Sequence, residues 1–207
     1  MTSVSIFGAG NMGAAIGRIA VKGGAEVQIV APTLEAAAAV ASSMGATAAV
    51  SGDALTGQIV VFAVPYSAVA EITASYAEQL SGKIIVDVTN PVDYTTYDAM
   101  IVPADSSAAQ QIAMSVPTAK VLKAFNTTFA GTLASGQTGG MPTTVLIAGD
   151  DQPSKDQLAA IVRASGLAAM DVGSLKRARE LEALGFLVST LAASGRITWA
   201  GGFVIAS

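Results

Sequence analysis

The stretch Val4-Ser5-Ile6-Phe7-Gly8-Ala9-Gly10-Asn11-Met12-Gly13 decides the fold of this chain. Its first four residues have the pattern of a short apolar strand, the next six are spaced as GxGxxG, and a helical pattern follows to Lys22. In this context Gly8 permits a tight turn, Gly10 lets the backbone approach a pyrophosphate, and Gly13 brings the helix close to the sheet. Because the first N–H groups of the helix would face the phosphates, Gly8, Ala9, Gly10, Asn11, Met12 and Gly13 are predicted to bind a dinucleotide. A tight turn without a ligand is the alternative.

Strand and helix patterns alternate outward from this turn. Strands are expected at 26–30, 47–50, 58–64, 83–88, 120–125, 143–148 and 167–172, and helices at 34–44, 67–80, 105–116, 153–165 and 174–194. The alternation predicts an α/β fold of the Rossmann type, a doubly wound, mostly parallel sheet with a small C-terminal helical extension. We expect a dinucleotide-binding domain over residues 1–173, with a helix and tail over 174–207 packed on it. Two long loops are expected at 92–104 and 127–142, and loops of that length are often functional.

Composition narrows the classes of partner. The chain has 207 residues, of which 52% are hydrophobic and 13% charged, and its net charge is −4. No basic stripe points to nucleic acid. The longest strongly apolar run, 59–64, is far below the ~20 residues that cross a bilayer, and no signal peptide is visible. We therefore expect a cytoplasmic protein without a nucleic-acid or membrane partner, whose sparsely charged surface favours a homodimer.

The sequence contains no cysteine and no histidine. This excludes disulfides, thiol nucleophiles, thiolate or imidazole metal sites and the Ser-His-Asp triad. The chemistry then falls to carboxylates, tyrosine, lysine or a cofactor, and hydride transfer fits the last case because the protein only binds and orients. No catalytic residue and no metal ligand is assigned.

The end of the second predicted strand bears on the choice of nicotinamide cofactor. NAD enzymes usually place Asp or Glu there, ~20 residues beyond the glycines, whereas this chain has Ala31-Pro32-Thr33. No carboxylate would repel a 2′-phosphate, and Thr33 could donate a hydroxyl. The segment therefore favours NADP(H), with NAD as the alternative cofactor and a simple helix cap as the alternative role of Thr33.

Two further strand ends are predicted to contact the cofactor. Ala63-Val64-Pro65-Tyr66 and Asn90-Pro91 follow strands at the carboxyl edge, where ligands bind in open α/β sheets. Val64 or Pro65 would pack near the nicotinamide, with Tyr66 as a polar handle or an aromatic wall. Asn90 would bond the ribose or carboxamide, unless it serves only an Asn-Pro turn.

Five segments together resemble a known family. They are 7–13 (FGAGNMG), 63–66 (AVPY), 121–126 (VLKAFN), 145–150 (VLIAGD) and 171–182 (DVGSLKRARELE). The chain resembles bacterial and archaeal reductases that exchange hydride between NADP(H) and a deazaflavin, coenzyme F-420. The resemblance implies that a deazaflavin or flavin co-substrate lies against the nicotinamide. The implied acceptor site is lined by Asn126, Thr127, Thr128, Trp199, Gly201, Gly202 and Phe203.

This chain departs from the family at two places. The family usually has a Ser-Arg pair where this chain has Ala31-Pro32, and some members have histidine at the position of Asn126. The glycine turn is also similar to that of pyrroline-carboxylate reductases and hydroxyacid dehydrogenases. Those enzymes need a substantial helical domain after the Rossmann part, whereas one helix and a tail follow here.

Three functions are compatible with these patterns. The first is hydride transfer between NADP(H) and a flavin-like, deazaflavin or quinoid small-molecule acceptor. The second is reduction of a small imine or carbonyl, for which Tyr66, Tyr94, Tyr97 or Lys123 would have to donate the proton. The third is a non-catalytic NADP(H) sensor.

Overall fold

A computed structural model of the chain describes residues 2–205. Its strands are β1 (Ser3–Phe7), β2 (Glu26–Ala31), β3 (Thr47–Val50), β4 (Ile59–Phe62), β5 (Ile84–Asp87), β6 (Lys120–Ala124), β7 (Gln137–Thr138), β8 (Met141–Pro142), β9 (Thr144–Gly149) and β10 (Ala168–Gly173). Its α-helices are α1 (Asn11–Lys22), α2 (Leu34–Ala41), α3 (Val69–Ser75), α4 (Ala77–Leu80), α5 (Ala108–Ser115), α6 (Ala130–Ser135), α7 (Gln152–Ala164) and α8 (Ala178–Ala193). Short 3-10 turns at Ser42–Met44, Tyr66–Ala68 and Leu175–Arg177 precede or follow them.

Eight strands form one sheet in the order β10-β9-β6-β5-β4-β1-β2-β3. Every neighbouring pair is parallel except β6 and β9. The chain order reverses between β1 and β4, so the loops after these two strands diverge and leave a crevice at their carboxyl ends. The predicted Rossmann-type fold is confirmed.

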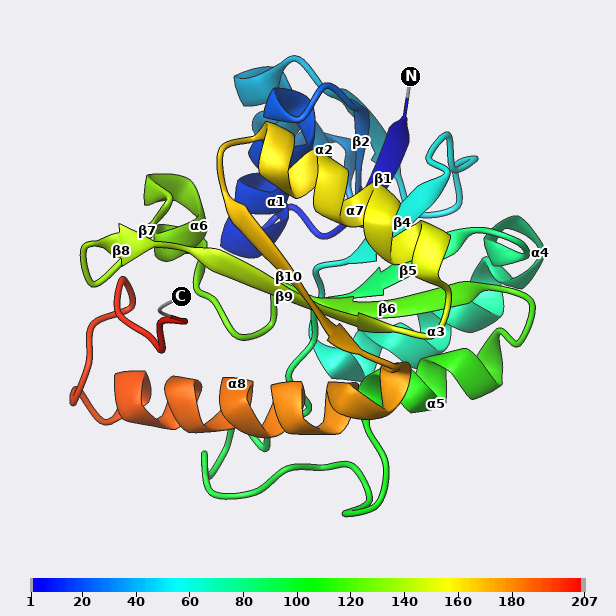
Figure 1. The fold of residues 1–207 in the computed structure, drawn as a ribbon. Coiled ribbons are helices and arrows are strands. Elements are labelled where there is room, and N and C mark those ends of the chain that lie inside the picture. Colours follow the sequence, from blue (N-terminus) through cyan, green and yellow to red (C-terminus); the bar gives the residue numbers. More distant parts are fainter. Residues whose placement is uncertain (1, 206–207) are drawn as a thin grey trace.

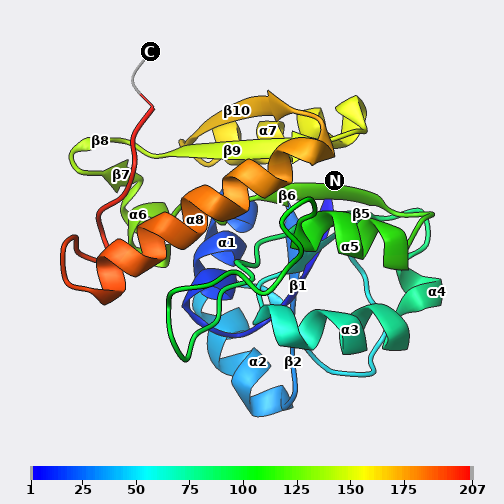
Figure 2. The ribbon, with the colours of Figure 1, turned by 90° about the horizontal axis from the view of Figure 1, so that it is seen from below.

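Helices cover both faces of the sheet (Figure 1). On one face α1, α2 and α7 bury apolar side chains against alternate residues of the strands. On the other face α3 and α5 pack against the remaining strand residues. Leu175, in the 3-10 turn before α8, and Ala178, the first residue of α8, join the same cluster. Figure 2 shows α8 crossing beneath β9 and β10, where Leu181 meets Leu146 and Ala148. β4 is buried along its whole length, as its continuous apolar run predicts.

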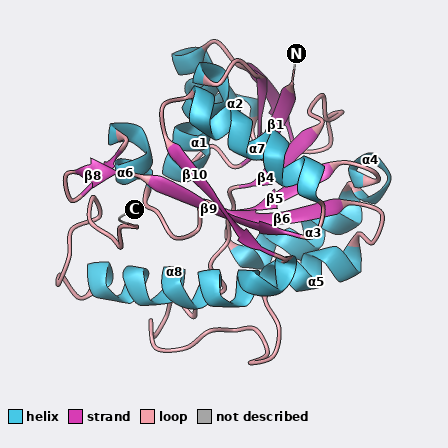
Figure 3. Cartoon of the chain, in the orientation of Figure 1, coloured by secondary structure: helices cyan, strands magenta, loops and turns pink. Residues whose placement is uncertain are grey.

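Two local predictions are wrong. The segment 127–142 is not a plain loop, because it contains α6 and the β7–β8 hairpin (Figure 3). The glycine- and threonine-rich composition of this segment does not predict α6, whose Leu133 is buried in the core. Gly136 ends α6 with a φ of 72°. The helix expected at 67–80 breaks at Tyr76, whose ring is buried 4.9 Å from Phe7, centroid to centroid.

The C-terminal segment after α8 has no regular secondary structure as far as residue 205. It turns back from α8 toward α6, and a side chain on Gly131 would lie 3.2 Å from the carbonyl oxygen of Trp199. Among residues 2–205, no helix has both the length and the apolar character that a bilayer crossing requires.

Candidate functional site

The glycine turn after β1 has the geometry that its sequence predicts. Gly8 has a φ of 114°, and a side chain there would overlap the carbonyl oxygen of Ala63. A side chain on Gly13 would overlap the carbonyl of Gly8, so the helix can approach the turn only with glycine at this position. At Gly10 the opposite holds, because no atom of the described residues lies within 4 Å of the place that a Cβ would occupy. The turn is therefore closed at Gly8 and Gly13 and open at Gly10.

The open side of this turn faces the start of α1. Gly10 occupies the N-cap position, and no described side chain caps the helix. The carbonyl of Gly10 already accepts a hydrogen bond from Ala14, whereas the N–H groups of the first turn have no intrahelical partner. Such N–H groups and the positive end of the helix dipole favour an anion at this place.

Two cavities flank the turn and share Val64 as a common wall. The first, of about 530 Å³, lies toward β2 and β3. The second, of about 430 Å³, lies toward β5 and β6. An elongated ligand with a pyrophosphate at Gly10 would place one end in each cavity. We call them the adenosine-side and the nicotinamide-side cavity.

The adenosine-side cavity contains part of the predicted ribose segment. Ala31 and Pro32 line it, together with Ser51, Gly52 and Glu71. The hydroxyl of Thr33 accepts a hydrogen bond of 3.2 Å from the N–H of Ala36, so Thr33 caps α2. Glu71, on the exposed side of α3, is the charged residue in the described lining. The sequence signal for Ser51 and Gly52 was their position directly after a predicted strand, at the same sheet edge.

Most of the residues predicted at the nicotinamide end meet in the second cavity. Its lining includes Gly10, Asn11, Met12, Ala63, Val64, Pro65 and Asn90. Ala9 packs against the apolar core, and Pro91 is buried beside the cavity without lining it. Tyr66 lines neither cavity, since its hydroxyl donates a 2.5 Å hydrogen bond to Gln111 on α5. Burial, followed by the nearby charge of Glu182, raises the pKa of this phenol, so it stays protonated at neutral pH.

Asn90 and Asn126 form a reciprocal pair at the ends of β5 and β6. The side-chain amide of Asn90 donates to the backbone carbonyl of Asn126 at 2.9 Å. The side-chain amide of Asn126 donates to Asn90 Oδ1 at 2.9 Å and to the carbonyl of Leu181 at 2.8 Å. Asn90 Oδ1 and the carbonyl of Leu181 can only accept hydrogen bonds, so the NH₂ group of the Asn126 amide must face them. The Oδ1 atom of Asn126 is buried and has no hydrogen-bond partner among residues 2–205. A side chain at Gly185 of α8 would overlap Asn90 Oδ1, so α8 must also present glycine here.

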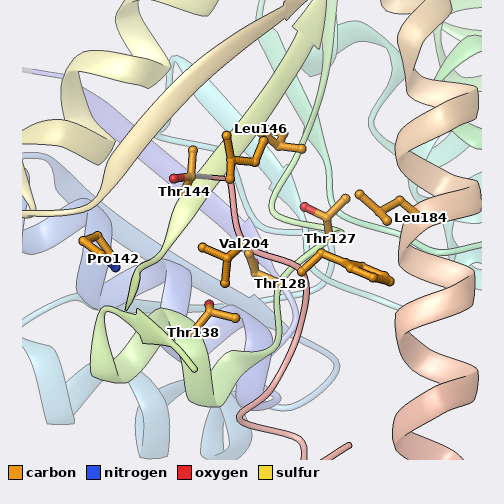
Figure 4. Close-up of a pocket in the computed structure, with 10 residues that line it drawn as sticks. Thr127, Thr128, Thr138, Pro142, Thr144, Leu146, Leu184 and Val204 are labelled. Carbon is orange, nitrogen blue, oxygen red and sulfur yellow. The ribbon is translucent and has the colours of Figure 1, made fainter. Parts of the chain in front are cut away.

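The residues predicted for the acceptor divide between two places. Asn126, Thr128 and Trp199 line the nicotinamide-side cavity. Thr127 and Phe203 line a cavity of about 40 Å³ between β9 and α8, where Val204 lies near Thr138 (Figure 4). Thr128 lines both cavities. Gly201 and Gly202 line neither cavity. The tail therefore contributes Trp199 to the larger cavity, while Phe203, Val204 and Ile205 line the smaller one and remain partly exposed.

Three more aromatic residues complete the walls of this cavity: Tyr94 and Tyr97, which the sequence offered only as proton donors for an imine or carbonyl, and Phe129, which it did not assign. Tyr94 and Tyr97 come from the loop between β5 and α5, and Phe129 precedes α6. Their sequence signal was weak, because single aromatic residues in long loops have no regular spacing.

A buried ion cluster lies behind the cavity. Lys123 Nζ lies 2.7 Å from Asp87 Oδ2 and 2.8 Å from Glu182 Oε1, and all three side chains are fully buried. Lys123 also donates to the carbonyl of Thr89, and Glu182 accepts from the N–H groups of Ala108 and Ala109 at the start of α5. Burial raises the pKa of Glu182, against the lowering effect of Lys123. Lys123 therefore supports the β5 end and does not reach the cavity as a proton donor.

The residues present fit a nicotinamide dinucleotide. Gly10 leaves open space at an anion-binding helix end, and cavities lie on both sides of it. Thr89 and Asn126 line the nicotinamide-side cavity, and each has a buried side-chain oxygen without a hydrogen-bond partner among residues 2–205. An unsatisfied buried group costs about 1–3 kcal/mol.

Comparisons with known proteins agree with this geometry. Residues 3–91 match the family model described as NADP oxidoreductase coenzyme F420-dependent. The chain is 37% identical over 126 residues to metalloreductase STEAP3 of Rattus norvegicus, and the aligned segment covers 61% of this chain and 24% of that protein. It is 25% identical over 132 residues to the F420-dependent NADP reductase of Methanocaldococcus jannaschii, and this aligned segment covers 62% of this chain and 59% of that protein. The chain thus spans less than two thirds of both curated relatives.

One solved structure matches over nearly the full length of both chains. It is a protein from Arthrobacter sp. FB24, provisionally assigned as an F420-dependent NADP reductase, with a TM-score of 0.84, 27% identity and 99% coverage of each chain. The resemblance inferred from the sequence motifs is therefore confirmed. Residues 3–91 thus carry a domain that matches the model described as NADP oxidoreductase coenzyme F420-dependent, and the chain as a whole has the fold of the Arthrobacter protein.

Proposed function

We propose that this protein transfers hydride between NADP(H) and a flavin-like or deazaflavin acceptor. The observation that carries the proposal is the pair of cavities that meet at the open Gly10 position, one on each side of the glycine turn. The first-turn N–H groups of α1 would hold the pyrophosphate, and Ala63 to Pro65 would form the wall behind the nicotinamide. When bound, NADP(H) supplies the hydride, and the protein supplies position and a shielded cavity.

The second cavity has the size of a small-molecule site. A volume of about 430 Å³ lies within the usual range for small-molecule sites, ~300–1,000 Å³. Asn126, Thr128 and Trp199 line it beyond Pro65, where an acceptor would meet the nicotinamide. We propose NADP(H) as the preferred cofactor, since the β2 end presents Ala31 and Pro32 without a carboxylate. NADH would remain a usable substrate, because no cation among the described lining residues holds a 2′-phosphate.

Reduction of a small imine or carbonyl is the second candidate. Of the four possible proton donors, Tyr94 and Tyr97 line the nicotinamide-side cavity, whereas Lys123 and Tyr66 are engaged elsewhere. The Tyr94 hydroxyl donates a long hydrogen bond of 3.4 Å to the carbonyl of Asn90. Burial raises the pKa of Tyr94, so its phenol is protonated and able to donate.

Steady-state oxidation of NADPH tests both candidates. The purified protein would be assayed with riboflavin, FMN, coenzyme F420, menadione and a cyclic imine, beside a Gly10→Val control. Turnover with a ring acceptor supports the first candidate, and turnover with the imine alone supports the second. NADPH binding without turnover on any acceptor would favour a sensor and contradict the proposed activity.

We also propose that residues 174–207 belong to the same domain as residues 1–173, and that the protein is a cytoplasmic homodimer. Leu175 and Ala178 pack in the core with Phe62, which supports the single domain. Leu187 on α8 and Val204 in the tail are exposed apolar side chains that a second subunit would cover. Light scattering at several concentrations measures the mass, and a monomer throughout would contradict the dimer.

A further inference from the structure

We propose that the buried cluster of Asp87, Lys123 and Glu182 carries one net negative charge, and that this charge makes the nicotinamide-side cavity bind the cationic ring of NADP⁺ more tightly than the neutral ring of NADPH. The inference rests on the proposed NADP(H) function and gives an electrostatic role to three residues that line neither flanking cavity. A site that favours the oxidised ring makes bound NADPH the stronger hydride donor, because positive charge develops on the ring as the hydride leaves.

The hydrogen-bond partners of the cluster determine its charge. Asp87 accepts from the N–H of Thr89 at 2.9 Å and from the ammonium of Lys123 at 2.7 Å. Glu182 accepts from Lys123 at 2.8 Å and from the first two N–H groups of α5 at 2.9 and 3.3 Å. All of these partners are donors, so neither carboxyl group has an acceptor for a proton of its own among the described residues. Two carboxylates and one ammonium leave a net charge of −1.

The fold keeps this charge in place and away from water. All three side chains are fully buried, and a buried charge is screened much less than an exposed one. The carboxylate of Glu182 also lies at the start of α5, where the helix dipole stabilises it. The same face of α8 is held against the strand ends, since the carbonyl of Leu181 accepts from Asn126 at 2.8 Å and Gly185 lies too close to Asn90 for any side chain. α8 therefore holds Glu182 rigidly beside the sheet.

Thr89 connects the cluster to the cavity. Its N–H donates to Asp87 and its carbonyl accepts from Lys123, while the residue itself lines the cavity. The field of the cluster extends to Tyr66, which follows Pro65 of the cavity wall. Burial raises the pKa of this phenol, and the two carboxylates raise it further against the lowering effect of the ammonium. The negative charge therefore dominates on this side of the cavity, whose described lining residues are all uncharged.

The two sides of the cavity then have opposite polarity, as a nicotinamide dinucleotide does. The start of α1 at Gly10 favours an anion, which is where the pyrophosphate would lie. The turn after β5 lies in front of the negative cluster, which favours the cationic ring. Only Thr89 separates the cluster from the cavity. For a separation of about 10 Å and an effective dielectric constant of about 20–40, one charge favours the cationic ring by about 4- to 16-fold.

Dissociation constants of both nucleotides test the inference. NADPH is titrated by its fluorescence, and NADP⁺ is measured by its displacement of NADPH. The wild type should bind NADP⁺ at least about threefold more tightly than NADPH. This preference should persist at high salt, because salt screens surface charges and leaves a buried charge largely unscreened.

Neutralising variants assign the preference to the cluster. Glu182→Gln keeps the shape of the side chain and removes the net charge, so the ratio of the NADP⁺ to the NADPH dissociation constant should rise at least about threefold. Asp87→Asn removes the same charge on the other side of Lys123 and should raise the ratio in the same way; it serves as the test if Glu182→Gln does not fold. Glu182→Asp retains the charge and should leave the ratio within about twofold of the wild type, even where both affinities fall.

Two controls separate the electrostatic role from a structural one. Gly185→Ala forces a side chain against Asn90 without changing any charge, and it should weaken binding of both nucleotides alike. Asp171→Asn removes a partly exposed carboxylate from β10, at the edge of the sheet, and should leave the ratio unchanged. Far-UV circular dichroism checks the fold of each variant.

Several results would overturn the inference. They are a wild type without the preference for NADP⁺, a preference that disappears at high salt, and a rise below about threefold in the folded neutralising variants. An equal rise in Gly185→Ala or Glu182→Asp would also overturn it, because the effect would then be structural. A wild-type protein that binds neither nucleotide would refute the proposed function itself, and this inference with it.

Discussion

Replacing Gly10 with valine separates binding of the dinucleotide from folding. The backbone of Gly10 has φ −85° and ψ −174°, an extended conformation that valine adopts readily. No atom of the described residues lies within 4 Å of the new Cβ, so the side chain meets no obstacle there. Valine is a poorer N-cap than glycine, and we expect a loss of about 1 kcal/mol in the free energy of unfolding. The protein should fold.

The expected loss of NADPH affinity is much larger. The valine side chain would project from the turn into the space at the start of α1 where the pyrophosphate would lie. A hydrogen bond to a charged group contributes about 1.5–3 kcal/mol. Displacing the pyrophosphate from two backbone N–H groups should therefore weaken binding by about 3–6 kcal/mol, or roughly 10²- to 10⁴-fold.

NADPH fluorescence titration measures the affinity, and far-UV circular dichroism with thermal unfolding checks the fold. Gly82→Ala is the control, because Gly82 has a φ of 73° and lies between α4 and β5, at the opposite edge of the sheet from the turn. It should lose about 1–2 kcal/mol of stability without loss of NADPH affinity. A folded Gly10→Val protein with wild-type affinity would refute the assignment of the pyrophosphate to this turn.

Three further changes test other parts of the structure. Glu71→Gln removes a carboxylate from the adenosine-side cavity. NADPH should then bind about two- to threefold more tightly relative to NADH, because the carboxylate no longer repels the 2′-phosphate. An unchanged ratio of the two dissociation constants would contradict this placement of the 2′-phosphate. Lys123→Met leaves Asp87 and Glu182 buried without their cation, and chemical denaturation should show a loss of about 3–5 kcal/mol, whereas a loss under 1 kcal/mol would show that the cluster is not stabilising. The hydrogen bond from Lys155 lowers the pKa of Asp171 in the folded protein. The ionised Asp171 carboxylate therefore stabilises the fold above its unfolded pKa, and this stabilisation is lost as the pH falls through its folded pKa. Wild type should therefore exceed Asp171→Asn in stability at pH 7, and the difference should disappear once the pH falls below the folded pKa of Asp171. A difference that persists in strong acid would refute the ion pair as its cause.

Much of the fold could be predicted because its signals are local. A four-residue apolar strand, two glycines in the turn and a helix start lie within Val4 to Gly13, and their conformations depend on neighbours in the chain. The continuous apolar run of β4 likewise predicted a strand that is buried on both faces. Where tertiary contacts overrode local preference, prediction failed. Leu133 packs into the core and stabilises α6 within a segment rich in glycine and threonine, and the buried ring of Tyr76 interrupts a helical pattern.

The candidate site shows the same division. By itself the sequence determined the glycine turn, the strand ends at 63–65 and 90, and the absence of histidine and cysteine chemistry, since each is a property of residue type and short spacing. Only the tertiary structure brought Asn90 to Asn126, 36 residues away, and Asn126 to Leu181, 55 residues away. It likewise placed Tyr94 and Tyr97 in the same cavity as Trp199 and enclosed Lys123 between two carboxylates. These contacts depend on strand order and on how α8 and the tail fold back, and no periodicity along the chain encodes which distant side chains share one cavity.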